Sequence, residues 1–401
     1  MGGVRGAEHE PADGSFVVMR PRSPGSRLLA VGVLAALICG LSGGAAITPE
    51  SSPRTTRSYV VTYFYGAISP NSEKEDCPDG FAKQPDPAQY YKDLTPAQLQ
   101  AMQTGTFAVR VKFFERMSHR GPAGEDTCEH PTVDPGASMP VGRSKIGYGL
   151  HLDGGNASQA HCAHDEMTSP DGLQGVDNQI ERLTACIRQR RQNGFLPSYE
   201  LNKMREGQFT LLIQISGADN LRDADNVEVL LTSSPDPLVF STDGKTPLEY
   251  ASYTLGDNPR YHNVLKGRIR GGVLETVPNS VVVPSNEFRK EESFRDAQLR
   301  LVFKSDGTLA GLLGGYRDLD EFYRPVIWGG YYNEQYAGPY TCPGFYNALH
   351  ALADGFPDPK TGRCTAISSA TRIEAIPAFA TPSARRTASS ATNRPGAAAR
   401  S

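Results

Sequence analysis

The sequence predicts a mainly β protein, with sandwich or jelly-roll-like antiparallel sheets, a few peripheral helices and stabilising disulfide bonds. Three observations lead to this fold class. Runs of β-branched and aromatic residues recur along the chain with turn signals between them. The 41 Gly and 30 Pro residues among 401 favour turns over long helices. Six cysteines beyond the apolar N-terminal segment supply enough thiols for a disulfide-stabilised domain.

The expected strands are the segments in which β-branched, aromatic or alternating apolar residues dominate. They are 59–65, 107–113, 209–216, 227–232, 262–270, 280–283, 298–304 and 308–313. Between the last two, Ser305-Asp306-Gly307 predicts a hairpin turn, because an Asp-Gly pair readily takes positive φ. Strands that recur with turns from 209 to 315 are typical of a sandwich or a barrel.

Three helices are expected beside the strands. The first runs over 95–103 and opens with a capping box that has proline at the first helical position. The second runs over 178–192, is capped by Asp177 and gathers its apolar residues on one face. The third runs over 345–354 and is ended by Gly355.

Residues 1–46 predict a secretory signal region. An apolar run over 29–41 follows several arginines and precedes small residues, so cleavage is expected after Ala46. The run is shorter than the about 20 apolar residues that a membrane span needs, and no span is expected after processing. Met19 opens a conventional leader, which predicts that translation starts there rather than at Met1.

The rest of the chain divides by composition. Residues 47–58 are polar and rich in Pro, Ser and Thr, which predicts a flexible linker. Residues 59–376 hold all the expected strands and form a single β-rich domain with helical and loop insertions. Residues 377–401 carry arginines and no acidic residue, which predicts a disordered basic tail.

Cysteine usage agrees with export to an oxidising compartment, either periplasmic or extracellular. Removal of Cys39 with the signal leaves an even set of cysteines, which are expected to form disulfides. The set is Cys77, Cys128, Cys162, Cys186, Cys342 and Cys364. Because loop closure favours near neighbours, the expected pairs are 77 with 128, 162 with 186 and 342 with 364.

The segment 151–178 combines acidic residues with glycines, which is the composition of loops that bind hard cations. The expected ligands to Ca²⁺ are Asp153, Asp165, Asp171 and Asp177. The alternative is an irregular loop whose acids form Asx-turns and cap the next helix. A third hypothesis places zinc at His151, His161 and His164 with Asp165.

Aromatic residues concentrate in the segment 322–346, which also contains the only Trp of the chain. Rigid rings beside glycines can form a platform that stacks on a sugar or another flat ligand. The expected binding residues are Trp328, Tyr331, Tyr332 and Tyr336. The alternative is that these rings close a core beneath a loop-rich segment.

No motif in the sequence identifies a reaction, so whether the chain is an enzyme stays open and its catalytic residues are unknown. The sequence has no nucleophile elbow, no P-loop and no GxGxxG that opens a helix. The net charge of −3 argues against a nucleic-acid partner. The sequence favours an exported, non-catalytic binding or envelope-associated protein with structural calcium, whose partner is a glycan or another envelope component. The alternative is a secreted glycan-acting hydrolase that uses loop carboxylates and the aromatic platform.

Overall fold

The computed structural model describes residues 55–92, 94–114, 117–154, 162–286 and 289–383, so the predicted signal region lies outside the described residues. Strand β1 (Thr56–Gly66) begins inside the predicted linker, and β13 (Cys364–Thr381) continues into the predicted tail. The two strands pair with each other, which satisfies their backbone groups and extends the domain beyond its predicted limits at both ends.

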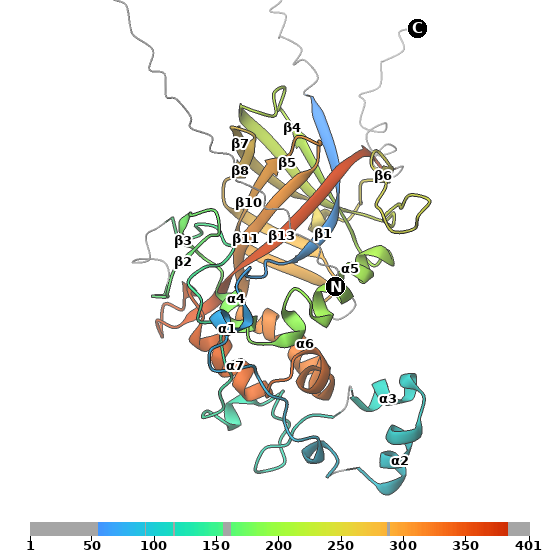
Figure 1. The fold of residues 1–401 in the computed structure, drawn as a ribbon, viewed down its shortest axis with the longest axis vertical. Helices are drawn as coiled ribbons and strands as arrows, with labels where there is room; N and C mark the ends of the chain where they lie inside the picture. Colours follow the sequence, from blue (N-terminus) through green and yellow to red (C-terminus); the bar gives the residue numbers. More distant parts are fainter. Residues whose placement is uncertain (1–54, 93, 115–116, 155–161, 287–288, 384–401) are drawn as a thin grey trace, which may run out of the picture. The chain divides into compact units, whose positions relative to one another are not determined.

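Eight antiparallel strands close into a barrel rather than the predicted sandwich or jelly roll (Figure 1). In spatial order they are β1, β4 (Thr210–Ser216), β5 (Ala224–Ser234), β7 (Asn263–Arg270), β8 (Val273–Thr276), β10 (Glu291–Phe303), β11 (Leu309–Asp318) and β13. The pairing of β13 with β1 closes the ring, with Ile376 opposite Val60. Closure pairs each of these strands on both sides, whereas a sandwich leaves open sheet edges.

Five further strands lie outside this ring in the described part of the chain. Strand β9 (Asn279–Pro284) pairs with β10, β12 (Gly355–Pro357) pairs with β13, and β6 (Ser252–Thr254) runs parallel to the end of β13. Strands β2 (Met167–Thr168) and β3 (Gln174–Val176) form a small separate sheet within the acidic segment. That segment is therefore partly ordered by its own strand pair.

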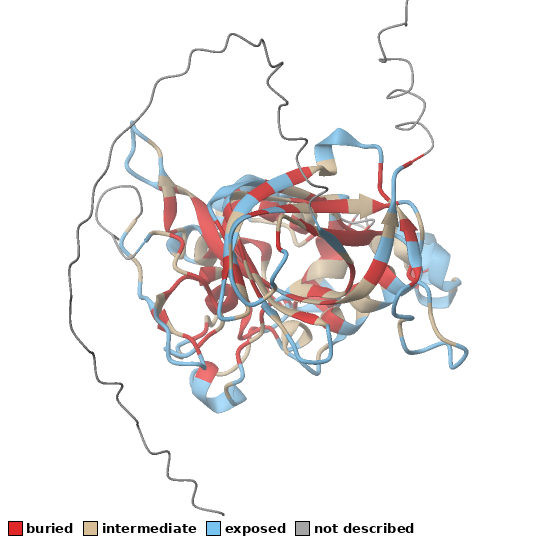
Figure 2. Cartoon of the chain, turned by 90° about the horizontal axis from the view of Figure 1, so that it is seen from above, coloured by how far each residue is buried: buried red, intermediate tan, exposed pale blue. Residues whose placement is uncertain are grey.

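Apolar side chains from all eight barrel strands pack into one core. Among them are Ile213, Val229, Leu265, Leu301 and Ile373, all fully buried. Figure 2 shows buried positions in red along the barrel strands and exposed positions in blue on the surrounding loops. An eight-stranded barrel is just narrow enough for side chains to fill its interior. The centre of this barrel is therefore a packed core.

Most strand predictions are confirmed. Seven of the eight expected segments coincide with β1, β4, β5, β7, β9, β10 and β11. The Asp-Gly turn joins β10 to β11, where Phe303 lies opposite Leu309 and Gly307 has a φ of 86°. These segments were predictable because each alternates or concentrates apolar residues over the length of one strand.

The helices of the described residues are α1 (Glu73–Asp76), α2 (Pro96–Thr104), α3 (Phe107–Phe114), α4 (Gln179–Thr184), α5 (Phe195–Arg205), α6 (Leu319–Tyr332) and α7 (Cys342–Ala351). Helix α2 has the predicted capping box, and α7 confirms that the third expected helix exists. This helix runs from Cys342 to Ala351, so the predicted stop at Gly355 was wrong, and Gly355 begins β12 instead. Helices α4, α5, α6 and α7 gather at one end of the barrel strands (Figure 1). None of the described helices is long and apolar enough to cross a membrane.

Two other local predictions were wrong. The expected strand 107–113 is helix α3, where Phe114 stacks on Tyr331 and Phe113 packs against the same small cluster. Alternating apolar residues fit a strand, but the tertiary packing of Phe113 and Phe114 in this small cluster overrides that local preference. The expected helix 178–192 is the shorter α4, which ends at Thr184 two residues before the bonded Cys186. Its cap is Asn178 rather than the predicted Asp177, whose carboxylate bonds Leu152 and His164 instead.

Three disulfides are present, as expected from the even set of cysteines, but the nearest-neighbour pairing was wrong. The bonds join Cys77 to Cys186, Cys128 to Cys342 and Cys162 to Cys364, at sequence separations of 109, 214 and 202 residues. Loop closure discriminates weakly between partners, since each doubling of loop length costs only about 0.6 kcal/mol. The tertiary fold therefore decided which cysteines meet.

Candidate functional site

A polar cavity of about 60 Å³ lies where the helices meet the end of the barrel. Its walls come from the ends of β1, β10, β11 and β13 and from helices α4, α5 and α6. The charged side chains that line it are Glu181, Arg190, Glu200, Arg289, Glu292 and Arg317. Ionisable groups are seldom buried in such numbers outside functional sites, which makes this cavity the leading candidate.

An ion triad around Glu292 forms one wall of the polar cavity. Arg317 Nη1 lies 2.5 Å from one carboxylate oxygen of Glu292, and Arg289 Nη1 lies 3.1 Å from the other. Burial opposes ionisation of Glu292, but the guanidiniums of Arg317 and Arg289 outweigh it and lower its pKa to about 2. Glu292 is therefore a permanent anion that is shared by two cations.

Glu200 reaches the same cavity from helix α5. Its Oε1 accepts a hydrogen bond of 2.6 Å from Asn286 Nδ2, and both side chains are buried. Burial raises the pKa of Glu200, although the nearby Arg289 works in the opposite direction. Glu200 consequently holds its proton to a higher pH than an exposed glutamate does.

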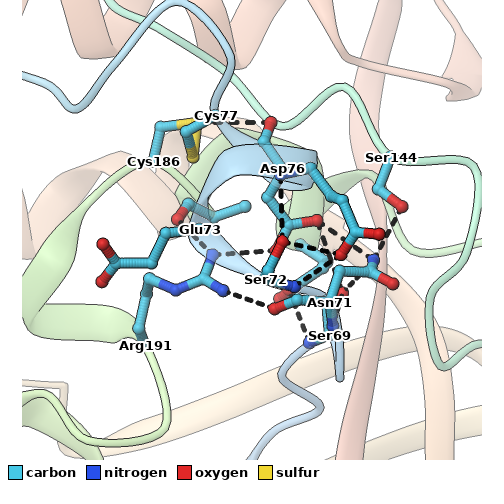
Figure 3. A network of polar contacts seen from close by, with 12 residues as sticks. Ser69, Asn71, Ser72, Glu73, Asp76, Cys77, Ser144, Cys186 and Arg191 are labelled. Atoms are coloured by element: carbon cyan, nitrogen blue, oxygen red, sulfur yellow. Dashed lines mark hydrogen bonds and ion pairs between the residues drawn. A yellow bond between two sulfur atoms is a disulfide. The ribbon is translucent and has the colours of Figure 1, made fainter.

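Glu181, on α4, is the third carboxyl of the cavity. Its Oε1 accepts a hydrogen bond of 2.7 Å from the Ser69 backbone N–H, and burial raises its pKa to about 7. A polar network holds the Ser69 segment in place (Figure 3), in which Arg191 pairs with Asp76 at 2.8 Å next to the Cys77–Cys186 bond. The proton on Glu181 is thus lost close to neutral pH.

We expect Glu181→Gln to flatten the pH dependence of stability. The pKa of Glu181 is about 7 in the folded chain and about 4.5 in the unfolded chain, so the folded state binds the extra proton between these values. This contribution is fully present below pH 4.5 and is lost as the pH rises through 7, a change of roughly 3 kcal/mol. Glutamine does not ionise, so the variant should lose less free energy of unfolding than the wild type between pH 5 and pH 8.

Urea denaturation at several pH values measures this difference. Glu228→Gln serves as the control, because Glu228 is exposed on β5. If the wild type and both variants showed the same slope of unfolding free energy against pH, the assignment of this proton to Glu181 would be wrong.

Arg190 differs from the other two arginines of the polar cavity. Its Nε is buried without a hydrogen-bond partner among the described residues, and its charge acts on Glu200 with no ion pair between the two side chains. Arg289 and Arg317, by contrast, are both engaged by Glu292. A guanidinium carries five N–H donors, so Arg190 offers unused donors on the cavity wall.

A second cavity, of about 70 Å³ and lined mainly by aromatic and aliphatic side chains, shares a wall with the polar cavity. Its apolar lining includes Phe195, Tyr199, Phe322, Val326, Tyr332 and Tyr340. Arg190, Glu200, Arg289 and Phe322 line both cavities. The two together provide charged groups at one end and an apolar surface at the other, the usual composition of a small-ligand site.

The predicted aromatic platform is divided among different environments. Tyr332 lines the aromatic cavity, whereas Tyr331 is buried against Tyr90 with 4.6 Å between ring centroids. Trp328 and Tyr336 are 50% and 49% exposed. Of the four predicted binding residues, the structure therefore places Tyr332 in the candidate site, and the stacking role of the others stays a prediction.

The predicted calcium ligands also separate. Asp153 and Asp177 come together with His164, and ligand atoms of the three lie within 4.8 Å of one another. The carboxylate of Asp165 is 88% exposed, and that of Asp171 accepts a hydrogen bond from Ser169. Calcium binding by all four carboxylates remains a prediction.

The zinc hypothesis divides in a similar way. His164 joins Asp153 and Asp177, His151 lines a different surface cavity, and His161 lies outside the described residues. Of the three histidines, only His164 has carboxylates beside it in the described residues. Zinc binding by all of these side chains together remains a prediction.

Sequence reasoning missed the charged residues of the polar cavity. A signal was present in β10, where Glu292 and Phe294 alternate with more exposed neighbours and so share the buried face. A charged residue in register with a core aromatic marks a buried ion. Its partners Arg289 and Arg317 carried no such sequence signal, because the fold alone brings them to Glu292.

Comparison with protein-family models, curated proteins and solved structures found no match to this chain. Inference about function therefore depends on the chemistry of the cavities and clusters described above.

Proposed function

We propose that the chain is an exported binding protein that holds a small carboxylic acid as its anion. The carboxylate of the ligand binds Arg190, and its short apolar part lies in the aromatic cavity. The unused donors of Arg190 on a wall common to both cavities are the observation that carries the proposal. Planar guanidinium groups bind carboxylates through two parallel hydrogen bonds.

The charge balance of the polar cavity favours an anion. Three arginines line it, and Glu292 is the carboxyl with a lowered pKa among the three glutamates. The raised pKa of Glu181, about 7, reduces its negative charge near neutral pH, and burial also raises the pKa of Glu200. A bound carboxylate would then neutralise the remaining positive charge, which is costly to keep unpaired in a buried site.

The size of the two cavities limits the ligand to a few heavy atoms. A cavity that binds benzene measures about 150 Å³, whereas these measure about 60 and 70 Å³. An acid with two to four carbons fits this space, and a sugar ring does not. Glycan cleavage is therefore not proposed for these two cavities.

Export is part of the proposal, with either the periplasm or the exterior as the destination. Three disulfides that each span more than 100 residues require an oxidising compartment during folding. The N-terminal apolar run preceded by arginines supplies the signal that such delivery needs.

We expect propionate to bind the purified chain and to raise its melting temperature. Binding to the folded state alone stabilises it by about 2.7 kcal/mol at a ligand concentration 100 times Kd. Arg190→Gln should weaken propionate binding by about tenfold to a hundredfold, because a charge-assisted hydrogen bond contributes about 1.5–3 kcal/mol. Isothermal titration of both proteins measures this ratio.

Two controls make the test specific. Arg205→Gln removes an exposed arginine that lies at the end of helix α5 and lines neither cavity, and it should leave propionate affinity unchanged. Propionamide has the shape of propionate without the charge and should bind weakly to every variant. Equal propionate affinity of the wild type and Arg190→Gln, or no binding of any acid from acetate to butyrate, would refute the proposal.

A further inference from the structure

The ring of His164 lies between two hydrogen-bond acceptors. Nδ1 is 3.0 Å from the backbone carbonyl oxygen of Cys162, and Nε2 is 2.8 Å from Oδ1 of Asp177. A carbonyl oxygen only accepts, so the ring carries a proton on Nδ1. In the neutral tautomer, Nε2 then directs a lone pair at a carboxylate, and a positive charge is needed between them.

This arrangement is typical of a histidine that ligates a metal. Such a histidine donates the hydrogen of its other ring nitrogen to a backbone carbonyl or a carboxylate, which fixes the ring for coordination. His164 meets that condition through Cys162, and its side chain is only 5% exposed. The free lone pair of Nε2 is then available to a cation.

Two carboxylates stand beside Nε2. One oxygen of Asp177 is held by the Leu152 backbone N–H at 2.8 Å, which turns the other oxygen toward His164. A carboxylate oxygen of Asp153 lies within 4.8 Å of both. Metal bonds of about 2.0–2.1 Å in a tetrahedral site place neighbouring ligand atoms about 3.3 Å apart, so shifts of about 1.5 Å or less complete the set.

Asp354 supplies an independent observation. It is fully buried, and its Oδ1 accepts a hydrogen bond of 2.7 Å from the Ser368 backbone N–H. Its Oδ2 has no hydrogen-bond partner among the described residues, and its charge acts on both His164 and Asp177. A buried carboxylate oxygen without a partner is costly unless a cation or a proton compensates it.

A disulfide fixes these groups relative to one another. Cys162, two residues before His164, is bonded to Cys364, and its backbone N–H donates to the carbonyl of Asp354 at 3.0 Å. The segments that carry His164 and Asp354 are therefore tied together before any ion binds, which lowers the entropic cost of assembling ligands.

We propose that Asp153, His164 and Asp177 bind a divalent transition-metal ion such as Zn²⁺, with Asp354 compensating its charge from the buried side. An imidazole nitrogen suits Zn²⁺ and its neighbours in the transition series, whereas Ca²⁺ takes oxygen ligands only. The inference involves none of the residues of the proposed carboxylate site, so either can fail without the other.

The competing state is an imidazolium on His164 that pairs with Asp177 and needs no metal. The hydrogen bond from His164 to Asp177 raises the pKa of His164 to about 9. Burial acts in the opposite direction, and the hydrogen bond to the Cys162 carbonyl raises the pKa further. The two states differ in whether the folded protein takes up an ion. Measuring the uptake of the metal ion by the folded chain distinguishes the two states.

The experiment is equilibrium dialysis and thermal melting of the disulfide-intact chain, treated with EDTA and then supplied with Zn²⁺ or Ca²⁺. We expect one Zn²⁺ per chain and a higher melting temperature. Asp153→Asn, at a partly exposed position, should weaken Zn²⁺ binding at least tenfold. Asp165→Asn and Asp171→Asn remove acids of the same segment and should leave Zn²⁺ binding unchanged.

Cobalt provides a second measurement that does not depend on stability. Co²⁺ bound by one nitrogen and carboxylate oxygens absorbs visible light, and His164→Gln should abolish that absorption in a chain that still melts cooperatively. Uptake of Ca²⁺ without Zn²⁺, no uptake of any ion, or equal Zn²⁺ binding by Asp153→Asn and wild type would each overturn the inference.

Discussion

Replacing Glu292 by glutamine is expected to destabilise the chain by about 3–5 kcal/mol, because the substitution leaves two buried arginines without a counter-charge. Arg317 and Glu292 are both buried, and Arg289 is largely so. The amide of glutamine has one acceptor oxygen instead of two and carries no negative charge. The two guanidiniums would then repel each other in a site that water cannot screen.

The neighbouring residue provides a matched control. Glu291 pairs with Arg260 on the outer side of β10, where both side chains are at least 31% exposed. Exposed ion pairs contribute about 0–1 kcal/mol, so Glu291→Gln should cost less than about 1 kcal/mol. Urea denaturation of the two variants measures the contrast, and similar losses would show that the Glu292 triad is not electrostatically buried.

A triple variant distinguishes the effect of unpaired charge in the triad from the effect of its packing. Arg289→Met, Glu292→Leu and Arg317→Met together remove every charge of the triad while keeping its volume. Apolar replacement of a complete buried ion network is often neutral or stabilising. We therefore expect the triple variant to unfold at a urea concentration close to that of the wild type. A loss as large as that of Glu292→Gln would mean that packing, rather than unpaired charge, explains the effect.

Loss of the Cys128–Cys342 bond is expected to have the second large effect. The bond closes a loop of 214 residues between two fully buried cysteines. While the Cys162–Cys364 bond is intact, the covalent path from Cys128 to Cys342 through that bond is much shorter than the path along the backbone. The chain-entropy relation then gives about 4 kcal/mol for the double variant Cys128→Ala, Cys342→Ala.

Urea denaturation of the oxidised double variant checks this value, and thiol titration confirms that the four remaining cysteines stay bonded. Cys77→Ala with Cys186→Ala, which opens a loop of 109 residues, serves for comparison. A loss below about 1 kcal/mol in the Cys128, Cys342 variant would contradict the expectation, because it would mean that the unfolded chain gains little freedom from opening this loop.

The strands were largely predictable because the information for them is local. In β4 and β5, apolar and β-branched residues follow one another over the length of a strand, and this pattern persists in any sheet. Barrel closure was not predictable in the same way. It depends on β13, whose small and polar residues gave no strand signal, finding β1 and β11 as neighbours on its two sides.

The candidate site shows the same limit. Asp177 and Asp153 stood out in the sequence because acids and glycines cluster around them. Asp354 lies almost 180 residues further along the chain, and only the fold brings it near His164. Arg190 was hidden for another reason: its importance lies in the partners that it lacks, which is a property of the packed structure.

The sequence by itself determined which segments form most of the barrel strands, where the tight β10–β11 turn lies and that the cysteines pair, because these depend on neighbouring residues and on an even count of thiols. Tertiary structure alone decided the closed barrel, the identity of each disulfide pair and the grouping of charges at the barrel end. Those features join residues that are distant in the chain, and their proximity is set by the burial of a common core.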